Sequence, residues 1–176
     1  MWVQKNDGQQ VTAQRATVLK AEMPMAEGTP TADLVAALRR TLADALTFYL
    51  RAHGFHWNVV GSDFTEYHAL FEAIYEDALG SLDPIAESIR KLDGVAPFRL
   101  PELMALRSIP DASLVAPLPA AMTADLLEAN EMMLDTLRGA FTIAAGTADE
   151  QGIANLLAER IDSHQKWSWQ LRSSLA

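Results

Sequence analysis

Five side chains in one stretch of this sequence have the chemistry of metal ligands. Two are imidazoles and three are carboxylates, and they are His56, His68, Glu72, Asp83 and Glu87. Nitrogen and oxygen donors of this kind suit iron or manganese. Because the sequence contains no cysteine, no thiolate is present to favour zinc or copper. The residue types therefore predict an iron or manganese site.

The spacing of these residues determines which of them can share an ion. At about 100° per residue, the four groups from His68 to Glu87 fall within an arc of roughly 100° on one helix face. They form two pairs, and 11 residues separate Glu72 from Asp83, which is roughly 16 Å along a helix. One ion cannot reach both pairs of one helix.

A second copy of the chain would solve this problem. If two such helices lie antiparallel across a two-fold axis, the His68 pair of one chain meets the Asp83 pair of the other. His56, at the end of the preceding helix, can join His68 and Glu72, so that each site holds two imidazoles and three carboxylates. The alternative is an ordinary solvated helix face, but two histidines in phase with the carboxylates favour metal binding.

Two long helices are expected to position these ligands. The first begins at Pro30, with Thr29 as its N-cap, and its apolar residues recur every three or four positions up to the first ligand. The second follows Asp63, which is expected to form a capping box with Glu66, and it ends near Leu92.

Two further helices are expected near the end of the chain. One begins at Thr123 and is closed by Gly146 in the C′ position. The other begins with a capping box of Thr147 and Glu150 and carries an apolar stripe to the end of the chain.

Residues 95–121 connect the second and third long helices. Five prolines prevent one long helix there, although a short helix can begin at Pro101. No segment has the alternating period of a strand. The sequence therefore predicts an all-α fold, a ferritin-like four-helix bundle with a short extra helix in the long connection.

The length of 176 residues fits one domain. Residues 1–28 are expected to be a flexible tail, with an ambiguous amphipathic piece around Val11 to Leu19, and residues 29–176 the bundle. No apolar run reaches the length of a membrane span, and no secretory leader is evident. We expect a soluble, cytoplasmic protein that does not bind membranes, with the nucleoid as a possible location.

The net charge of −9 works against binding to phosphate backbones. The densest basic region is the tail, where Lys5, Arg15 and Lys20 are diluted by acidic residues. DNA binding is therefore expected to be weak or absent.

The ligand region resembles that of the Dps mini-ferritins. The resemblance rests on the pattern H-W-N-V-x-G, a second histidine 12 positions after the first, and acidic residues at plus 16, 27 and 31. It continues through D-x-I-A-E-x-I-R, which begins at Asp83, and into the closing segment H-Q-K-W-S-W-Q-L-R-S-S-L. Only the first 28 residues fall outside it.

The resemblance implies a hollow dodecamer built from two-fold dimers. Each ferroxidase centre would hold two iron ions between subunits, oxidise Fe(II), preferably with hydrogen peroxide rather than dioxygen, and deposit ferric mineral inside the shell. It implies that one subunit supplies His56, His68 and Glu72, and that its two-fold mate supplies Asp83 and a bridging Glu87. Such a protein protects DNA from oxidative damage.

Two residues of the helix that carries the ligands differ from the Dps pattern or are variable in it. Position 72 is Asp or Glu in the family, so Glu72 is a mild variation that could shift the weaker iron. Pro84 is the larger departure, because proline inside a helix removes a hydrogen bond and predicts a kink beside Asp83. Gly80, whose carbonyl loses that bond, has no side chain and can ease the distortion.

Three other functional classes compete with a ferroxidase. The first is a nucleoid DNA-compacting protein with incidental metal binding. The second is a di-iron oxygenase, which builds its site inside one bundle from Glu-x-x-His motifs; the sequence contains no such motif. The third is a purely structural bundle.

The remaining candidate residues have simpler explanations. Packing or hydrogen bonding is expected for His53, Trp57 and the apolar-face His164. Capping explains Asp149 and Glu150, for which the family resemblance also suggests a role in an iron-entry pore.

Overall fold

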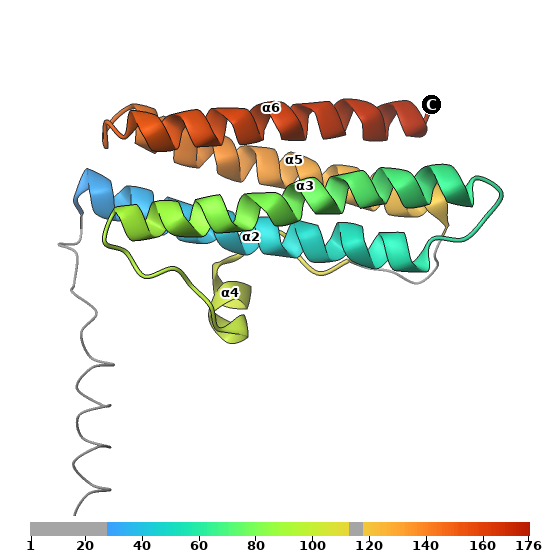
Figure 1. Cartoon of the computed structure of the whole chain (residues 1–176), viewed down its shortest axis with the longest axis horizontal. Helices are drawn as coiled ribbons and strands as arrows, with labels where there is room; N and C mark the ends of the chain where they lie inside the picture. Colours follow the sequence, from blue (N-terminus) through green and yellow to red (C-terminus); the bar gives the residue numbers. More distant parts are fainter. Residues whose placement is uncertain (1–27, 113–117) are drawn as a thin grey trace, which may run out of the picture.

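Five helices form in residues 28–112 and 118–176, the parts of the chain that the computed structural model describes. The four long ones are α2 (Pro30–Asn58), α3 (Phe64–Lys91), α5 (Pro119–Ala145) and α6 (Gln151–Ser174), and the short one is α4 (Leu100–Leu106). These residues contain no strand. The predicted all-α architecture, with a short helix in the long connection, is confirmed (Figure 1).

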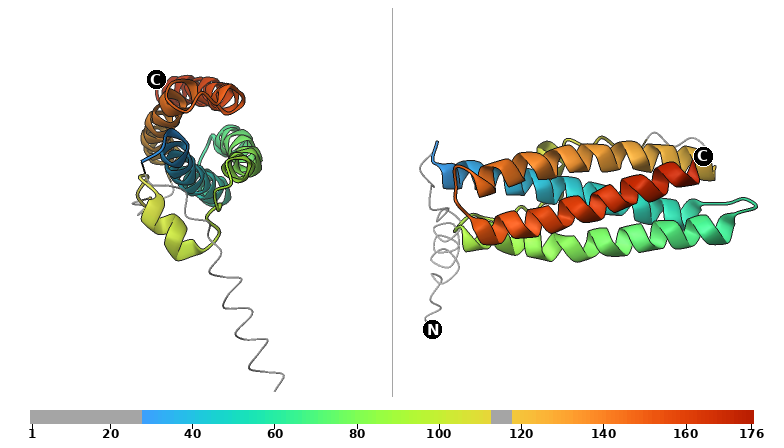
Figure 2. Two further views of the ribbon diagram at one scale, coloured as in Figure 1. Left: turned by 90° about the vertical axis from the view of Figure 1, so that its left-hand side faces the viewer. Right: turned by 90° about the horizontal axis from the view of Figure 1, so that it is seen from above.

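The four long helices surround one common core, and α4 lies outside them beside α2 (Figure 2). α2 and α3 form one antiparallel hairpin, and α5 and α6 form the other (Figure 1). Because α3 and α5 run in the same direction, the connection between them travels the length of the bundle. The expected tail is almost entirely outside the described residues, as are its amphipathic piece and its lysines and arginine.

The caps at the starts of α2 and α3 agree only in part with those predicted from the sequence. Thr29 caps α2 as predicted, because its hydroxyl accepts a hydrogen bond from the N–H of Ala32 at 3.2 Å. Asp63 is the N-cap residue of α3, but its carboxylate makes no capping bond and instead accepts from Ser62 at 3.0 Å. The capping box with Glu66 was therefore wrong.

The predicted start of α5 was also wrong. The helix begins at Pro119, where proline fits because the first turn needs no N–H donor. Thr123 is already inside the helix, and its hydroxyl donates to the carbonyl of Pro119 at 2.8 Å. Gly146 does end the helix, but as its C-cap with φ −102°, not as a left-handed C′ residue.

α6 begins later than its expected capping box. The N–H of Ala148 donates to Ile143 at 3.0 Å and that of Glu150 to Ala144 at 2.8 Å, so the turn continues through this segment. Glu150 itself is the N-cap residue and makes no side-chain capping bond. The capping box of Thr147 with Glu150, and the capping role expected for the Glu150 side chain, were wrong.

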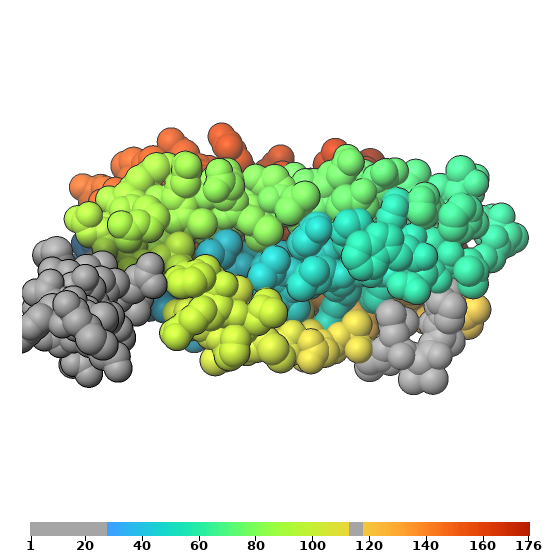
Figure 3. Space-filling view, turned by 60° about the horizontal axis from the view of Figure 1, so that its bottom comes forward, coloured from blue at the N-terminus to red at the C-terminus, as the bar shows by residue number. Residues whose placement is uncertain are grey.

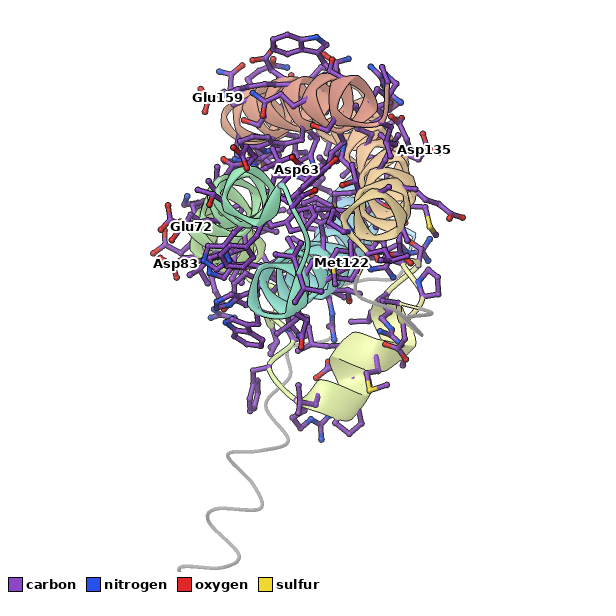
Figure 4. All side chains as sticks on the ribbon, turned by 90° about the vertical axis from the view of Figure 1, so that its right-hand side faces the viewer. Asp63, Glu72, Asp83, Met122, Asp135 and Glu159 are labelled. Atoms are coloured by element: carbon purple, nitrogen blue, oxygen red, sulfur yellow. The ribbon has the colours of Figure 1, made fainter. Side chains whose placement is uncertain are left out.

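The core is filled by apolar side chains from all four long helices. Its largest fully buried members include Phe48, Phe55, Phe71 and Met122, and Figure 4 shows Met122 pointing into the bundle. On α6 the predicted stripe is buried at most positions, including Leu157 and Leu171. No helix among the described residues is long and apolar enough to cross a membrane.

One buried carboxylate holds the long connection against the bundle. Asp44 of α2 is fully buried, and it accepts hydrogen bonds from the backbone N–H groups of Ser108 and Ile109 at 2.7 and 3.0 Å. Hydroxyls of Ser108 and Thr136 donate to its other oxygen. Four donors compensate the lost hydration of this charge, so the connection has a defined path over α2.

Candidate metal centre

The histidines His56 and His68 come together although 12 residues separate them. His56 is in the last turn of α2 and His68 is near the start of α3, and their rings stack with centroids 3.6 Å apart. The short turn at Gly61, whose φ of 141° favours glycine, brings the two helix ends side by side.

Each of these histidines is oriented by the backbone of the other. Nδ1 of His56 lies 3.0 Å from the carbonyl oxygen of His68, and Nδ1 of His68 lies 2.9 Å from that of His56. A carbonyl oxygen can only accept, so Nδ1 of each ring carries the proton. Nε2 therefore keeps its lone pair in both rings, which is the tautomer that a metal-binding imidazole needs.

The three carboxylates lie further along α3. Glu72 is half-buried, one turn after His68, whereas Asp83 and Glu87 are exposed. Figure 4 shows Glu72 and Asp83 projecting from the same side of α3, away from the bundle. In the described part of a single chain, no three histidine or acidic side chains come together as a metal site.

The five residues thus form two separate groups on one chain. The first consists of His56, His68 and Glu72, and the second of Asp83 and Glu87. We call them the histidine half-site and the carboxylate half-site.

α3 continues without interruption through Pro84, between the two carboxylates, and the carbonyl of Pro84 accepts from the Ser88 hydroxyl at 2.8 Å. The kink expected there stays a prediction.

A layer of aromatic rings lies behind the histidine half-site. Tyr75 of α3 stacks on His53 with centroids 3.9 Å apart and meets His56 edge-on at 5.1 Å. The ring of His53 also packs against Trp57 at a tilt of 43°, with centroids 4.1 Å apart, and its Nδ1 is 3.0 Å from the hydroxyl of Tyr49. The packing expected for His53 and Trp57 is confirmed, although Trp57 remains 65% exposed.

Sequence reasoning missed Tyr75. Tyr75 lies three residues after Glu72 and seven after His68, so helix geometry places it at the edge of the face that carries the predicted ligands. This spacing could have identified it from the sequence. Burial, together with the negative charges of Glu72 and Glu76, raises the pKa of the Tyr75 phenol.

His164 belongs to the core, as the sequence predicted. Its Nδ1 lies 2.6 Å from Oδ1 of Asn130, and its ring packs edge-on against Phe48. Burial lowers its pKa to about 3, so the ring is neutral at physiological pH. Met133 of α5 is also buried in the core.

Comparison with known proteins places this helical arrangement in a family. The model of the ferritin-like domain family matches residues 35–176. DNA protection during starvation protein 2 of Bacillus anthracis is 29% identical over 142 residues, which cover 81% of this chain and 96% of that protein. The chain belongs to the Dps family of ferritin-like proteins.

Other Dps-like proteins support the same assignment. The crystal structure of a Dps protein from Vibrio cholerae O1, described as a member of the ferritin-like diiron-carboxylate proteins, superposes with a TM-score of 0.79. It is 26% identical, and the match covers 87% of this chain and all of that one. An uncharacterized low temperature-induced protein of Nostoc is 29% identical over 136 residues, 77% of this chain and 76% of its own. The expected ferritin-like bundle is thereby confirmed.

Proposed function

We propose that this Dps-family protein is a mini-ferritin that oxidises Fe(II) at di-iron centres shared between two copies of the chain. The observation that carries the proposal is the histidine pair, whose Nδ1 atoms both bind backbone carbonyls and whose Nε2 atoms remain free to bind metal. Glu72 adds a carboxylate to this pair, and the donor set of nitrogen and oxygen atoms fits iron.

The separation of the two half-sites supports a shared centre. Asp83 and Glu87 are on the same face of α3 but roughly 16 Å further along the helix, so they serve another ion. An antiparallel second copy supplies each histidine half-site with the missing carboxylates. Leu79 lies between the half-sites on this face and is 47% exposed, which suits burial against a partner. Figure 3 shows α3, α2 and α4 exposed together on one side of the molecule.

The chain's own residues explain how such a centre would work. Several carboxylates brought together repel one another, so binding of Fe(II) relieves their repulsion. Two bound Fe(II) ions lose one electron each, and hydrogen peroxide accepts both, with two protons, to give two waters. Because both electrons leave together, no hydroxyl radical is released. The hard oxygen ligands suit the Fe(III) product.

The wider function that we propose is the one that the resemblance to the Dps mini-ferritins implies. Two-fold dimers assemble into a hollow dodecamer, ferric mineral collects inside, and removal of Fe(II) and peroxide protects DNA from oxidative damage. Hydrogen peroxide is the preferred oxidant, and dioxygen is the alternative. We propose that the protein acts in the cytoplasm.

Glu87→Ala tests the ferroxidase directly. Fe(II) is added without oxygen, peroxide follows, and Fe(III) formation is measured by its absorbance. Loss of one ligand from the carboxylate half-site should slow this step at least tenfold. Glu159→Ala, on the outer side of α6 (Figure 4), is the matched control and should behave as wild type. An unchanged rate in Glu87→Ala would refute the proposal.

DNA compaction is the second candidate, and the charge of −9 weighs against it. A gel shift that persists in moderate salt and disappears on deletion of residues 1–28 would favour it. An oxygenase site inside the bundle is disfavoured because the sequence contains no Glu-x-x-His motif, and the described core consists mainly of apolar side chains.

A further inference from the structure

We infer that Tyr49 is a reserve electron donor, which completes the reduction of peroxide when the proposed centre holds only one Fe(II). The inference rests on the proposed function, because it concerns the same reaction. When two Fe(II) ions are bound, both electrons come from iron. A centre with one Fe(II) supplies only one electron, so a hydroxyl radical escapes unless the protein supplies the second.

A chain of ring contacts leads from the histidine half-site to Tyr49. The ring of Tyr75 meets His56 edge-on with centroids 5.1 Å apart, and it meets Tyr49 edge-on at 6.3 Å. Both tyrosines are partly buried against the core. Aromatic rings give up an electron more readily than aliphatic side chains, so these contacts form a short path for one electron.

The path ends at Tyr49 because a base lies within hydrogen-bond distance of its phenol. The Tyr49 hydroxyl is 3.0 Å from Nδ1 of His53, and we assign the phenol as the donor in this bond. A phenol that has lost an electron is a strong acid. A base already in contact can take its proton without rearrangement, which makes loss of the electron easier.

His53 is held where this proton transfer requires it. Its ring stacks on Tyr75 with centroids 3.9 Å apart and an angle of 20° between the planes. It also packs against the indole of Trp57 at 4.1 Å. These two contacts leave the imidazole few alternative rotamers. The proton therefore remains beside the phenol oxygen and can return to it.

The electrons and protons of the step balance. One Fe(II) gives an electron to hydrogen peroxide, the O–O bond breaks, and hydroxide and a hydroxyl radical form. Tyr49 reduces the hydroxyl radical to a second hydroxide, and its own proton moves to His53. Two protons from solvent convert both hydroxides to water. The next Fe(II) reduces the tyrosyl radical, which recovers its proton from His53, so the sum equals the two-iron reaction.

Electron paramagnetic resonance tests the inference on protein loaded without oxygen with one Fe(II) per centre. Peroxide is added and the sample is frozen rapidly; we expect a tyrosyl radical. The chain has three tyrosines, so single variants assign the signal. It should be lost in Tyr49→Phe, where a spin trap in solution should capture more hydroxyl radical than with wild type. The matched control is Tyr67→Phe, which removes a hydroxyl bonded to the carbonyl of Ser174 at 3.1 Å and should keep the signal.

A second measurement concerns the proton and uses wild type itself. The proton held by His53 should couple to the radical, and this coupling should disappear when the solvent is D₂O. His53→Phe keeps a ring beside Tyr75 but accepts no proton, so any radical in this variant should lack the coupling.

Three results would overturn the inference: a tyrosyl signal that persists in Tyr49→Phe, a wild-type radical without the exchangeable coupling, or no radical in wild type. Iron oxidation by wild type with two Fe(II) per centre is measured beside these samples. Its absence would instead refute the proposed function, so the two failures are distinguishable.

Discussion

Mixing two inactive variants should restore iron oxidation if each centre is shared between two chains. His68→Ala damages the histidine half-site and leaves Asp83 and Glu87 intact. Glu87→Ala damages the carboxylate half-site and leaves the histidine pair intact. In a dimer with one chain of each kind, one centre combines two intact half-sites and the other combines two damaged ones.

The expected magnitude follows from this geometry. Neither variant can rescue itself, because the half-sites of one chain are roughly 16 Å apart on α3. With equal amounts and random pairing, half of the dimers are mixed and half of the centres in each mixed dimer are intact. About one quarter of all centres should then be active, and the fraction is the same in a larger assembly of such dimers.

The assay uses the two variants unfolded together, mixed and refolded, beside wild type treated in the same way. Peroxide is added to the Fe(II)-loaded protein without oxygen, and the amplitude of the Fe(III) absorbance is compared with that of refolded wild type. Native mass spectrometry of chains that carry different tags verifies that mixed dimers have formed. An amplitude no higher than that of either variant alone would refute the shared centre.

Two further predictions concern the interface and the core. Leu79→Arg places a charge between the half-sites without changing a ligand, so dimers and iron oxidation should both be lost in sedimentation and peroxide assays, whereas Leu175→Arg, at the end of α6, should keep iron oxidation. Burial lowers the pKa of His164 from 6.5 to about 3, so below pH 6.5 the unfolded chain binds a proton that the folded one excludes. The free energy of unfolding should therefore decrease as pH falls through this range, by roughly 1.4 kcal/mol per unit. Urea unfolding at pH 7 and 5 measures this loss, and an equally steep loss in His164→Gln would contradict the assignment.

Helix boundaries show where local sequence was sufficient and where it was not. Thr29 with Pro30 defines the start of α2, because both the cap and the proline act within one turn. Thr123 and Thr147 were misleading, since a threonine hydroxyl can equally bond within a helix or remain in a turn that continues from the previous helix. Which of these roles a threonine takes depends on how the helix packs in the folded chain, and the local sequence does not show this.

The ligand set shows the same division. Sequence alone predicted five ligands and their separation into two groups, because the phase and rise of a helix are local properties. It contained no direct sign that His56 and His68 would bond to each other's carbonyls, or that the Tyr75 ring would pack edge-on against His56. Those contacts exist because the turn at Gly61 brings the end of α2 against the start of α3, and ring orientation depends on which groups then lie opposite. The residue types therefore predict the metal chemistry, and the packing of the two helices decides how the predicted ligands His56 and His68 are oriented.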